Sequence, residues 1–101
     1  MKKYELVLLI DSQKGRDQAK EAVVEVEKLL SSLKGKVEET TDWGEKELAY
    51  KIKKAANAFF FLVQFSINPT KLPDLEKKLR LMENIIRYLI VVQAKSNKEK
   101  G

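Results

Sequence analysis

Five acidic side chains lie close together between residues 38 and 47, and carboxylates hold metal ions or exchange protons in many active sites. They are Glu38, Glu39, Asp42, Glu45 and Glu47. The surrounding residues favour a β-strand, in which successive side chains point to opposite faces, so these carboxylates do not converge. The chain has no histidine and no cysteine, the usual general base, nucleophile and soft metal ligands. We therefore expect a solvated strand edge, with no catalytic site, metal or cofactor.

A second possible chemistry is the stacking of nucleic-acid bases on the aromatic segment NAFFFLVQF, residues 57–65. In a strand, one face would hold Phe59, Phe61, Val63, Phe65 and Ile67, and the other Phe60, Leu62, Gln64 and Ser66. Gln64 and Ser66 are costly to bury beneath helices, so we expect the Phe61 face in the core. Phe59 and Phe60 lie near a turn, where a bulge could change their faces. Phe60 therefore stays open as a base-stacking candidate.

Domains of the RNA-recognition-motif type stack bases on aromatic side chains of an open sheet face. Their signature has a basic residue and a glycine before its first aromatic, where this chain has Asn57 and Ala58. We therefore expect the phenylalanines to form core rather than a base platform.

Positive charge is the better indication of a partner. The chain has 20 lysines and arginines against 15 acidic residues, a formal net charge of +5, and 17 of the 20 are lysines. This excess favours polyanionic partners but does not by itself separate nucleic-acid binding from solubility. The apolar run from Leu6 to Ile10 is too short for a signal peptide or a membrane span. We expect a soluble intracellular protein, suited to a reducing cytoplasm because it lacks cysteine.

The hydrophobic pattern predicts a first strand at 4–10 and a second at 36–53. The phenylalanine segment is predicted as a third strand that ends near Ile67, and IIRYLIVV, residues 85–92, as the last. KKAANA is predicted to turn the second strand into the third. One helix is indicated by an apolar stripe at Ala19, Ala22, Val23, Val26, Leu29, Leu30 and Leu33, and a second by Leu72, Leu75, Leu79 and Met82.

Local signals refine these elements. Gly35 stands where the first helix needs a left-handed residue at its end, and Gly44 indicates a bulge or a bend in the second strand. Thr70 can cap the second helix, whose first turn tolerates Pro73. Leu48, Tyr50 and Ile52 alternate with polar or small residues, which predicts a half-buried strand at a sheet edge.

The order β-α-β-β-α-β predicts an α+β, ferredoxin-like fold, a four-stranded antiparallel sheet with two helices on one face. We expect strand order 4-1-3-2, a single domain over residues 1–94 and a mobile polar tail at 95–101. This order brings Lys2 and Lys3 beside Lys95 at one end of the sheet. It brings Arg80 and Arg87 towards Lys51, Lys53 and Lys54 at the other. Between the ends lies an open face with Val7, Leu9, Leu62, Leu89 and Val91.

Three blocks of the chain are distinctive: KYELVLLID near the start, WGEKELAYKIKK in the centre and LRLMENIIRYLIVV near the end. Together they resemble the bacterial small-subunit ribosomal protein S-six family, and the resemblance covers about residues 3–92. The central block is the most specific, with Gly44, Leu48, Ala49, Tyr50, Ile52 and Lys54 at family positions.

The resemblance implies a cytoplasmic, non-enzymatic constituent of the small (30S) ribosomal subunit. It implies binding to the central domain of 16S ribosomal RNA as a heterodimer with ribosomal protein S-eighteen. RNA contact is then expected at Lys2, Lys3, Tyr4, Arg80, Arg87 and Lys95, and partner contact at Leu48, Ala49, Tyr50, Lys51 and Ile52.

The chain departs from the family at a few positions. Lys51 stands where proline is frequent, Ala58-Phe59 where Gly-Tyr is frequent, and Glu45-Lys46-Glu47 where a basic pair is common, which makes RNA contact by that segment less expected. The alternative reading is a homo-oligomeric protein–protein interaction module, without RNA affinity, in which the charge serves solubility.

Overall fold

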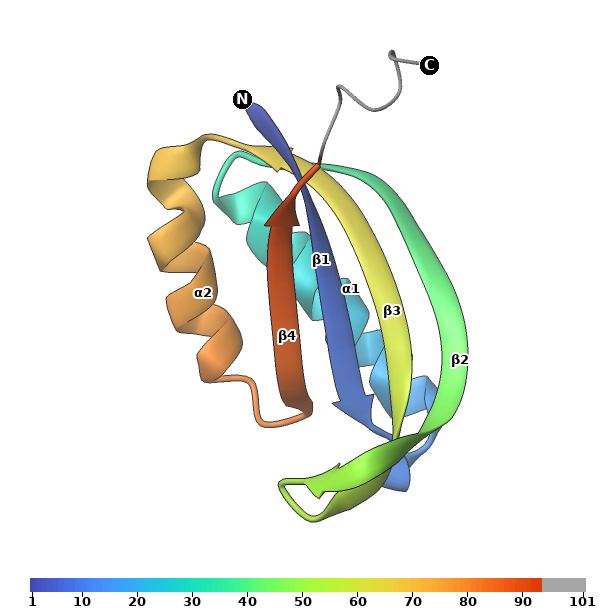
Figure 1. Cartoon of the computed structure of the whole chain (residues 1–101). Coiled ribbons are helices and arrows are strands. Elements are labelled where there is room, and N and C mark those ends of the chain that lie inside the picture. Colours follow the sequence, from blue (N-terminus) through green and yellow to red (C-terminus); the bar gives the residue numbers. More distant parts are fainter. Residues whose placement is uncertain (94–101) are drawn as a thin grey trace.

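The structure, a computed structural model, describes residues 1–93 and has the predicted element order (Figure 1). The strands are β1 (Lys2–Asp11), β2 (Lys36–Ile52), β3 (Ala55–Ile67) and β4 (Ile85–Val92). The helices are α1 (Arg16–Ser32) and α2 (Leu72–Arg80), each preceded by a 3₁₀ turn, Ser12–Lys14 and Pro69–Lys71. The tail predicted at 95–101 lies outside the described residues.

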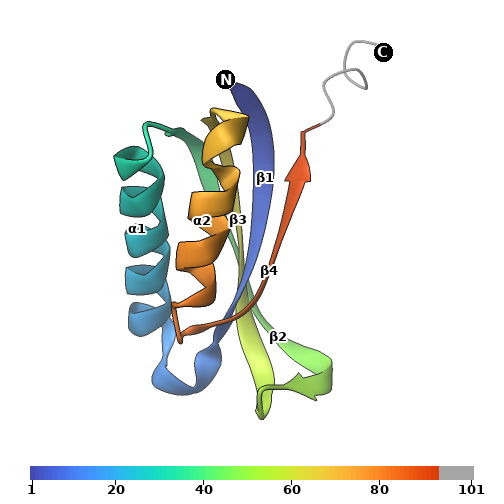
Figure 2. The ribbon, with the colours of Figure 1, turned by 90° about the vertical axis from the view of Figure 1, so that its left-hand side faces the viewer.

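The four strands form one antiparallel sheet in the order β2-β3-β1-β4, which confirms the predicted 4-1-3-2 arrangement. Both helices lie on the same side of this sheet (Figure 2). The ferredoxin-like α+β fold is therefore confirmed. β1 and β3 are central, and β2 and β4 are the two edges.

The main core lies between the sheet and the helices, and it confirms the predicted faces of the phenylalanine strand. Phe59, Phe61 and Phe65 are buried with Leu6, Leu8 and Ile10 of β1. The apolar stripe of α1 is buried or half-buried against them, as are Leu75 and Leu79 of α2. Burying one such side chain contributes about 1.5–3 kcal/mol, so this layer dominates the stability of the fold.

The end of α1 differs from the prediction in one residue. Lys34, not Gly35, adopts the left-handed conformation, with φ of 64°. Gly35 is needed for a different reason, because its amide donates to the Leu30 carbonyl over 2.8 Å and its backbone lies against β3. A Cβ at this position would lie 2.9 Å from the carbonyl oxygen of Ser66 and 3.1 Å from that of Leu30. The sequence identified the helix end correctly but not the steric role of the glycine.

We expect Gly35→Ala to lower the free energy of unfolding by about 1–3 kcal/mol, because the new methyl group meets backbone atoms that cannot rotate away. Lys34→Gly, at the left-handed position, introduces no clash and should leave the free energy unchanged or raise it by up to about 1 kcal/mol. Urea unfolding of both variants measures the difference. A Gly35→Ala protein as stable as the wild type would contradict the close approach of α1 to β3.

The capping residue before α2 also differs from the prediction. Asn68, not Thr70, is the cap, since its Oδ1 accepts from the Thr70 amide at 3.1 Å and from the Thr70 hydroxyl at 3.0 Å. Thr70 lies within the 3₁₀ turn, and α2 follows without a side-chain cap. Pro73 stands in the first turn of α2, as predicted. Amides of the first turn have no partner within the helix, so the missing amide hydrogen of proline costs no hydrogen bond there.

The β2–β3 hairpin is longer and tighter than KKAANA suggested. Only Lys53 and Lys54 form the turn, with φ values of 52° and 71°, and β3 begins at Ala55. Positive φ at both central residues is the geometry that matches the twist of paired strands. The predicted bulge is present, since the register shifts between Asp42 and Gly44, and Gly44 has φ of 85°.

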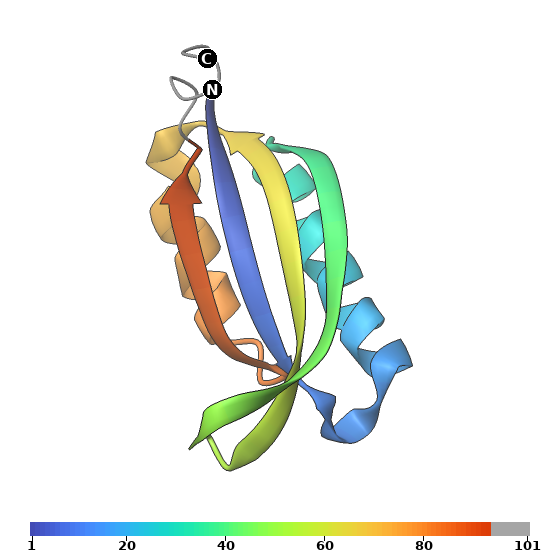
Figure 3. The same ribbon diagram turned by 45° about the vertical axis from the view of Figure 1, so that its right-hand side comes forward.

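The end of this hairpin bends to the side of the sheet opposite the helices (Figure 2) and crosses one end of the face that Figure 3 shows. It forms a second, smaller cluster of Ala55, Ala58 and Ile86, packed with Leu9, Leu48, Ile52 and Phe60. We call this group the hairpin cluster. Phe60 is therefore half-buried among aliphatic side chains, which resolves its open assignment in favour of packing.

The acidic segment of β2 behaves as the solvated edge that was expected. Asp42 pairs with Arg16 of α1 at 2.6 Å, and the Arg16 guanidinium lies 4.9 Å from the centre of the Phe59 ring. Glu38 accepts a hydrogen bond from Ser66 over 2.9 Å. Within residues 1–93 there is no group of three or more side chains that could hold a metal ion. In the same range no helix is long and apolar enough to span a membrane.

Candidate nucleic-acid interface

One basic end of the sheet is formed by the start of β1. Lys2 and Lys3 are exposed there, opposite Ile67 and Ser66 at the end of β3. The Gln93 amide donates to the Lys3 carbonyl over 2.9 Å, so the end of β4 lies beside these lysines, as the strand order predicted. Lys95, predicted at the same end, lies outside the described residues.

Tyr4 differs from these two lysines because its side chain is only 3% exposed. Its ring stacks on Phe65 with the centroids 5.6 Å apart. A ring held in this way has no free face for a base. RNA contact by Tyr4 stays a prediction, and the role that its geometry supports is to anchor Lys2 and Lys3 on the core.

The other basic end is a hollow of about 390 Å³ between the hairpin, the end of α2 and the start of β4. Lys53, Arg80 and Arg87 line it, one cation from each of these three elements, together with Leu79, Ile85, Ile86 and Tyr88. We call it the cationic hollow. Three cations facing one space match the several acceptor oxygens of a phosphate group.

A small network holds Arg80 at the rim of the cationic hollow. Its guanidinium lies 3.6 Å from Glu76, one helical turn earlier, and the Tyr88 hydroxyl donates to the same carboxylate oxygen over 3.0 Å. Burial, and then the hydrogen bond to Glu76, raise the pKa of Tyr88 above its ordinary value of 10.0. Arg80 itself is exposed, so it can leave Glu76 for a phosphate at small cost.

This raised pKa predicts a pH effect on stability. The folded protein holds the Tyr88 proton more tightly than the unfolded chain, so this contribution is complete below the unfolded pKa, about 10. It is lost as the pH rises through the folded pKa. Urea unfolding between about pH 9 and pH 11 should show a smaller decline for Tyr88→Phe than for the wild type. An equal decline in the free energy of unfolding for the two proteins would contradict the raised pKa of Tyr88.

The face between the two ends is less open than the sequence indicated. Val7, Leu9 and Leu62 are half-buried, and Leu9 packs on the hairpin cluster. The exposed apolar residues instead follow the edge strand β4, where Leu89 is 58% exposed and Val91 and Val92 are also open.

The predicted partner block, Leu48 to Ile52, has two parts. Leu48 and Ile52 are half-buried and pack on the hairpin cluster. Tyr50 is 83% exposed, between exposed Ala49 and Lys51, because the register with β3 shifts between Glu47 and Ile52 and strict alternation ends there. The half-buried position predicted for Tyr50 is therefore wrong, and its ring is free to contact another molecule.

Sequence reasoning did not include Lys53 among the site residues, although it placed this lysine at the right end of the sheet. Its position in the cationic hollow depends on how far the hairpin bends across the open face. The only local signal was its place in the turn between two strands.

Fold and site together define a class: a ferredoxin-like α+β domain that presents cationic side chains at both ends of one sheet. Residues 3–92 match the family described as Ribosomal protein S6. The chain therefore belongs to the ribosomal protein S6 family, as the three sequence blocks indicated.

Individual relatives agree with this assignment. The chain is 39% identical over 93 residues to the small ribosomal subunit protein bS6 of Fusobacterium nucleatum, an alignment that covers 92% of this chain and 99% of that protein. It is 30% identical to the protein of the same name from Dictyoglomus turgidum, covering 94% and 98%. The chain is thus a structural, non-enzymatic constituent of the small ribosomal subunit, which is a cytoplasmic particle in bacteria.

Solved structures support the fold. The 30S ribosomal protein S6 of Thermotoga maritima superposes with a TM-score of 0.88 at 24% identity, covering 98% of this chain and 94% of that one. The C-terminal domain of the MgtC protein of Mycobacterium tuberculosis gives a TM-score of 0.57 at 12% identity, covering 94% and 90%. The two neighbours differ in name and share the architecture, so the fold alone does not assign the function.

Proposed function

We propose that this chain binds the central domain of 16S ribosomal RNA, together with ribosomal protein S-eighteen as a heterodimer. The observation that carries the RNA part is the cationic hollow, where Lys53, Arg80 and Arg87 face one space. Lys2 and Lys3 provide a second group of cations at the far end of the sheet. A rigid sheet keeps the two groups at a fixed separation, which suits a folded RNA of defined shape.

The mechanism is phosphate recognition. Contacts to phosphates orient a protein on RNA without reading its sequence, and specificity then comes from the shape of the RNA. If about four or five phosphates are neutralised, the logarithm of the association constant should fall with the logarithm of the salt concentration with a slope of roughly −3 to −5.

For the partner, exposed apolar surface is the supporting feature. Tyr50 projects from the hairpin, and Leu89 and Val91 are open on the edge strand β4. A protein partner that covers such residues gains the hydrophobic contribution and adds its own contacts to the RNA. Binding of the pair should therefore be cooperative, with S-eighteen raising the affinity of this chain for the RNA.

A gel-shift titration on a central-domain fragment of 16S ribosomal RNA, with and without purified S-eighteen, tests this proposal. The expected result is tight binding with the partner and much weaker binding without it. Correct folding of the protein is checked by circular dichroism.

The same apolar residues of β4 also fit the homo-oligomeric module, since an unpaired edge strand can pair with a second copy. Sedimentation at several concentrations separates the two readings. A concentration-dependent dimer, together with no RNA shift under any condition, would replace the RNA proposal with the oligomeric one.

A further inference from the structure

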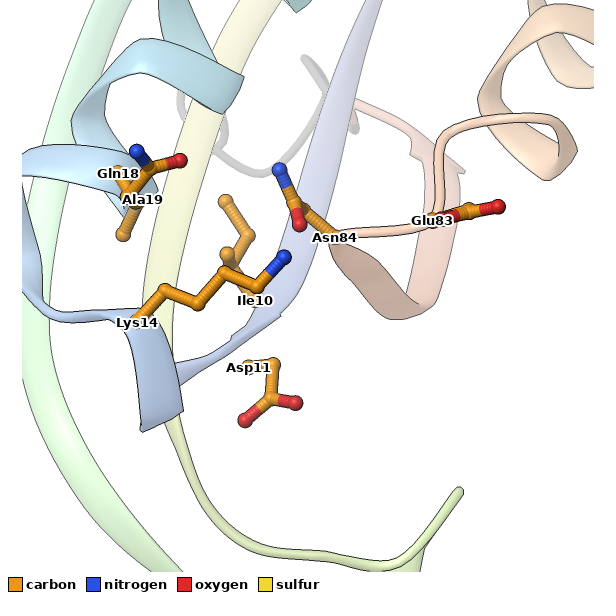
Figure 4. Close-up of a pocket in the computed structure, with 7 residues that line it drawn as sticks. All are labelled: Ile10, Asp11, Lys14, Gln18, Ala19, Glu83 and Asn84. Carbon is orange, nitrogen blue, oxygen red and sulfur yellow. The ribbon is translucent and has the colours of Figure 1, made fainter.

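A smaller hollow of about 130 Å³ lies between the end of β1, the start of α1 and the loop before β4 (Figure 4). Ile10 and Ala19 lie at its inner side but are only 1% and 0% exposed, so they offer almost no surface to a ligand. Lys14, Gln18 and Asn84 provide its polar part from three separate segments. This volume exceeds by about tenfold the roughly 10–15 Å³ that one water needs, and lies below the roughly 300 Å³ of the smallest drug-sized sites. It suits one small, flat ring system.

The polar groups of this hollow are available for a ligand. Within residues 1–93, the side chains of Lys14, Gln18 and Asn84 make no hydrogen bond or ion pair. Each amide offers donors and an acceptor, whereas the lysine only donates. Gln18 points towards Asn84 across the hollow in Figure 4. A ligand that uses all of them needs both donors and acceptors along one edge.

The charge of the hollow argues against a phosphate as its ligand. Lys14 is the one cation in the lining, while Asp11 and Glu83 are two carboxylates. Asp11 accepts from the Gln13 amide over 3.0 Å, and both carboxylates point away from the hollow in Figure 4. The lining thus carries a formal net charge of −1, which favours a neutral ligand.

The hollow adjoins the cationic hollow through the backbone of the loop before β4. Asn84 lines the smaller hollow, and the next residue, Ile85, lines the cationic one. A nucleic-acid strand with a phosphate among Lys53, Arg80 and Arg87 therefore has a polar hollow without excess positive charge beside it.

We propose that this smaller hollow binds one unpaired nucleobase of the RNA, with its edge against the amides of Gln18 and Asn84. Amide side chains pair with base edges through one donor and one acceptor, and unpaired bases are the parts of an RNA that proteins read individually. The inference rests on the proposed RNA binding and adds to it one sequence-dependent contact. It gives the interface a position at which the identity of a base matters.

The test is a double-mutant cycle with S-eighteen present. Fragments of the 16S central domain, each with a single abasic nucleotide, are titrated against the wild type and Gln18→Ala. Gln18 is exposed on a helix, so alanine is well tolerated there. At one abasic position the affinity of the wild type should fall roughly tenfold relative to the intact fragment. The affinity of Gln18→Ala should be nearly the same for the abasic and the intact fragment, because the contact is already missing. Asn84→Ala should couple to the same position. This variant should keep the fold, because the Asn84 main-chain carbonyl still accepts from the Asp11 amide.

Gln13→Ala is the matched control, an exposed glutamine that does not line the hollow and should couple to no position. Gln18→Ala should also leave the salt slope unchanged, because it removes no charge. Salt-dependent RNA binding with no coupling to Gln18 or Asn84 would overturn the base site and leave the RNA proposal standing. Absence of RNA binding by the folded wild type at any salt would overturn both.

Discussion

Replacing Lys53, Arg80 and Arg87 together by alanine is expected to weaken binding to the 16S central-domain fragment by about a hundredfold. The three side chains line one hollow, and each contact of an exposed cation with a phosphate contributes about 1 kcal/mol. Because three positive charges are removed, the salt slope should also become shallower by roughly 2 to 3. Equilibrium titration at several salt concentrations measures both quantities.

A matched triple variant separates this site from the effect of net charge. Lys20, Lys28 and Lys77 are exposed on the helices, on the opposite side of the sheet from the bent hairpin, and their replacement removes the same charge. This control should weaken binding only slightly. If it weakens binding as much as the triple variant of the hollow, the RNA is attracted by total charge and the cationic hollow has no special role.

Phe65→Ala is expected to lower the free energy of unfolding by about 3–5 kcal/mol, which is a large part of the stability of a domain of this size. Phe65 is 1% exposed and stacks on Tyr4, so the deletion leaves a cavity that neighbouring strands cannot close. Urea unfolding measures the loss. A cost near 1 kcal/mol would contradict the central position of this side chain.

Phe60→Ala provides the comparison within the same strand. Its side chain is half-buried in the smaller hairpin cluster, so we expect about half the cost of Phe65→Ala. RNA binding by the folded variant should be unchanged. A folded Phe60→Ala protein that binds RNA much more weakly would restore Phe60 as a base-stacking residue.

The parts of the fold that could be predicted are those fixed by periodicity. Gln64 and Ser66 placed the open face of β3, and this parity assigned Phe61, Val63 and Phe65 to the core. The stripe of α1 followed from spacings of three and four. These signals are local and repeated along each element, so single exceptions do not change the result.

Details that depend on backbone geometry were missed. The left-handed residue at the end of α1 is Lys34. The glycine beside it, Gly35, is needed instead because the carbonyl oxygen of Ser66 lies too close for a Cβ atom. Asn68 and Thr70 are both good capping residues, and the 3₁₀ turn Pro69–Lys71, which contains Thr70, leaves Asn68 at the capping position. In both cases two candidates stood within two residues of each other, and composition could not separate them.

The site was only partly predictable for a related reason. Strand order, together with the position of Arg80 late in the second helix, brought Arg80 and Arg87 to the same end of the sheet, and the structure agrees. The addition of Lys53 and the covering of Leu9 required the long-range bend of the hairpin, which buries Ile86 on the open side. A register shift between Leu9 and Ile10 of β1 accompanies this change and sends Ile85 into the main core instead. No residue pattern in β4 predicts this register shift.

That this chain holds ribosomal RNA through its phosphates is tested most directly by the salt dependence of one equilibrium constant. The dissociation constant for the 16S central-domain fragment, with S-eighteen present, is measured across a range of salt concentrations. We expect a log–log slope of roughly −3 to −5 for the association constant, reduced by the triple substitution of the cationic hollow. A slope near zero for correctly folded protein would contradict phosphate recognition.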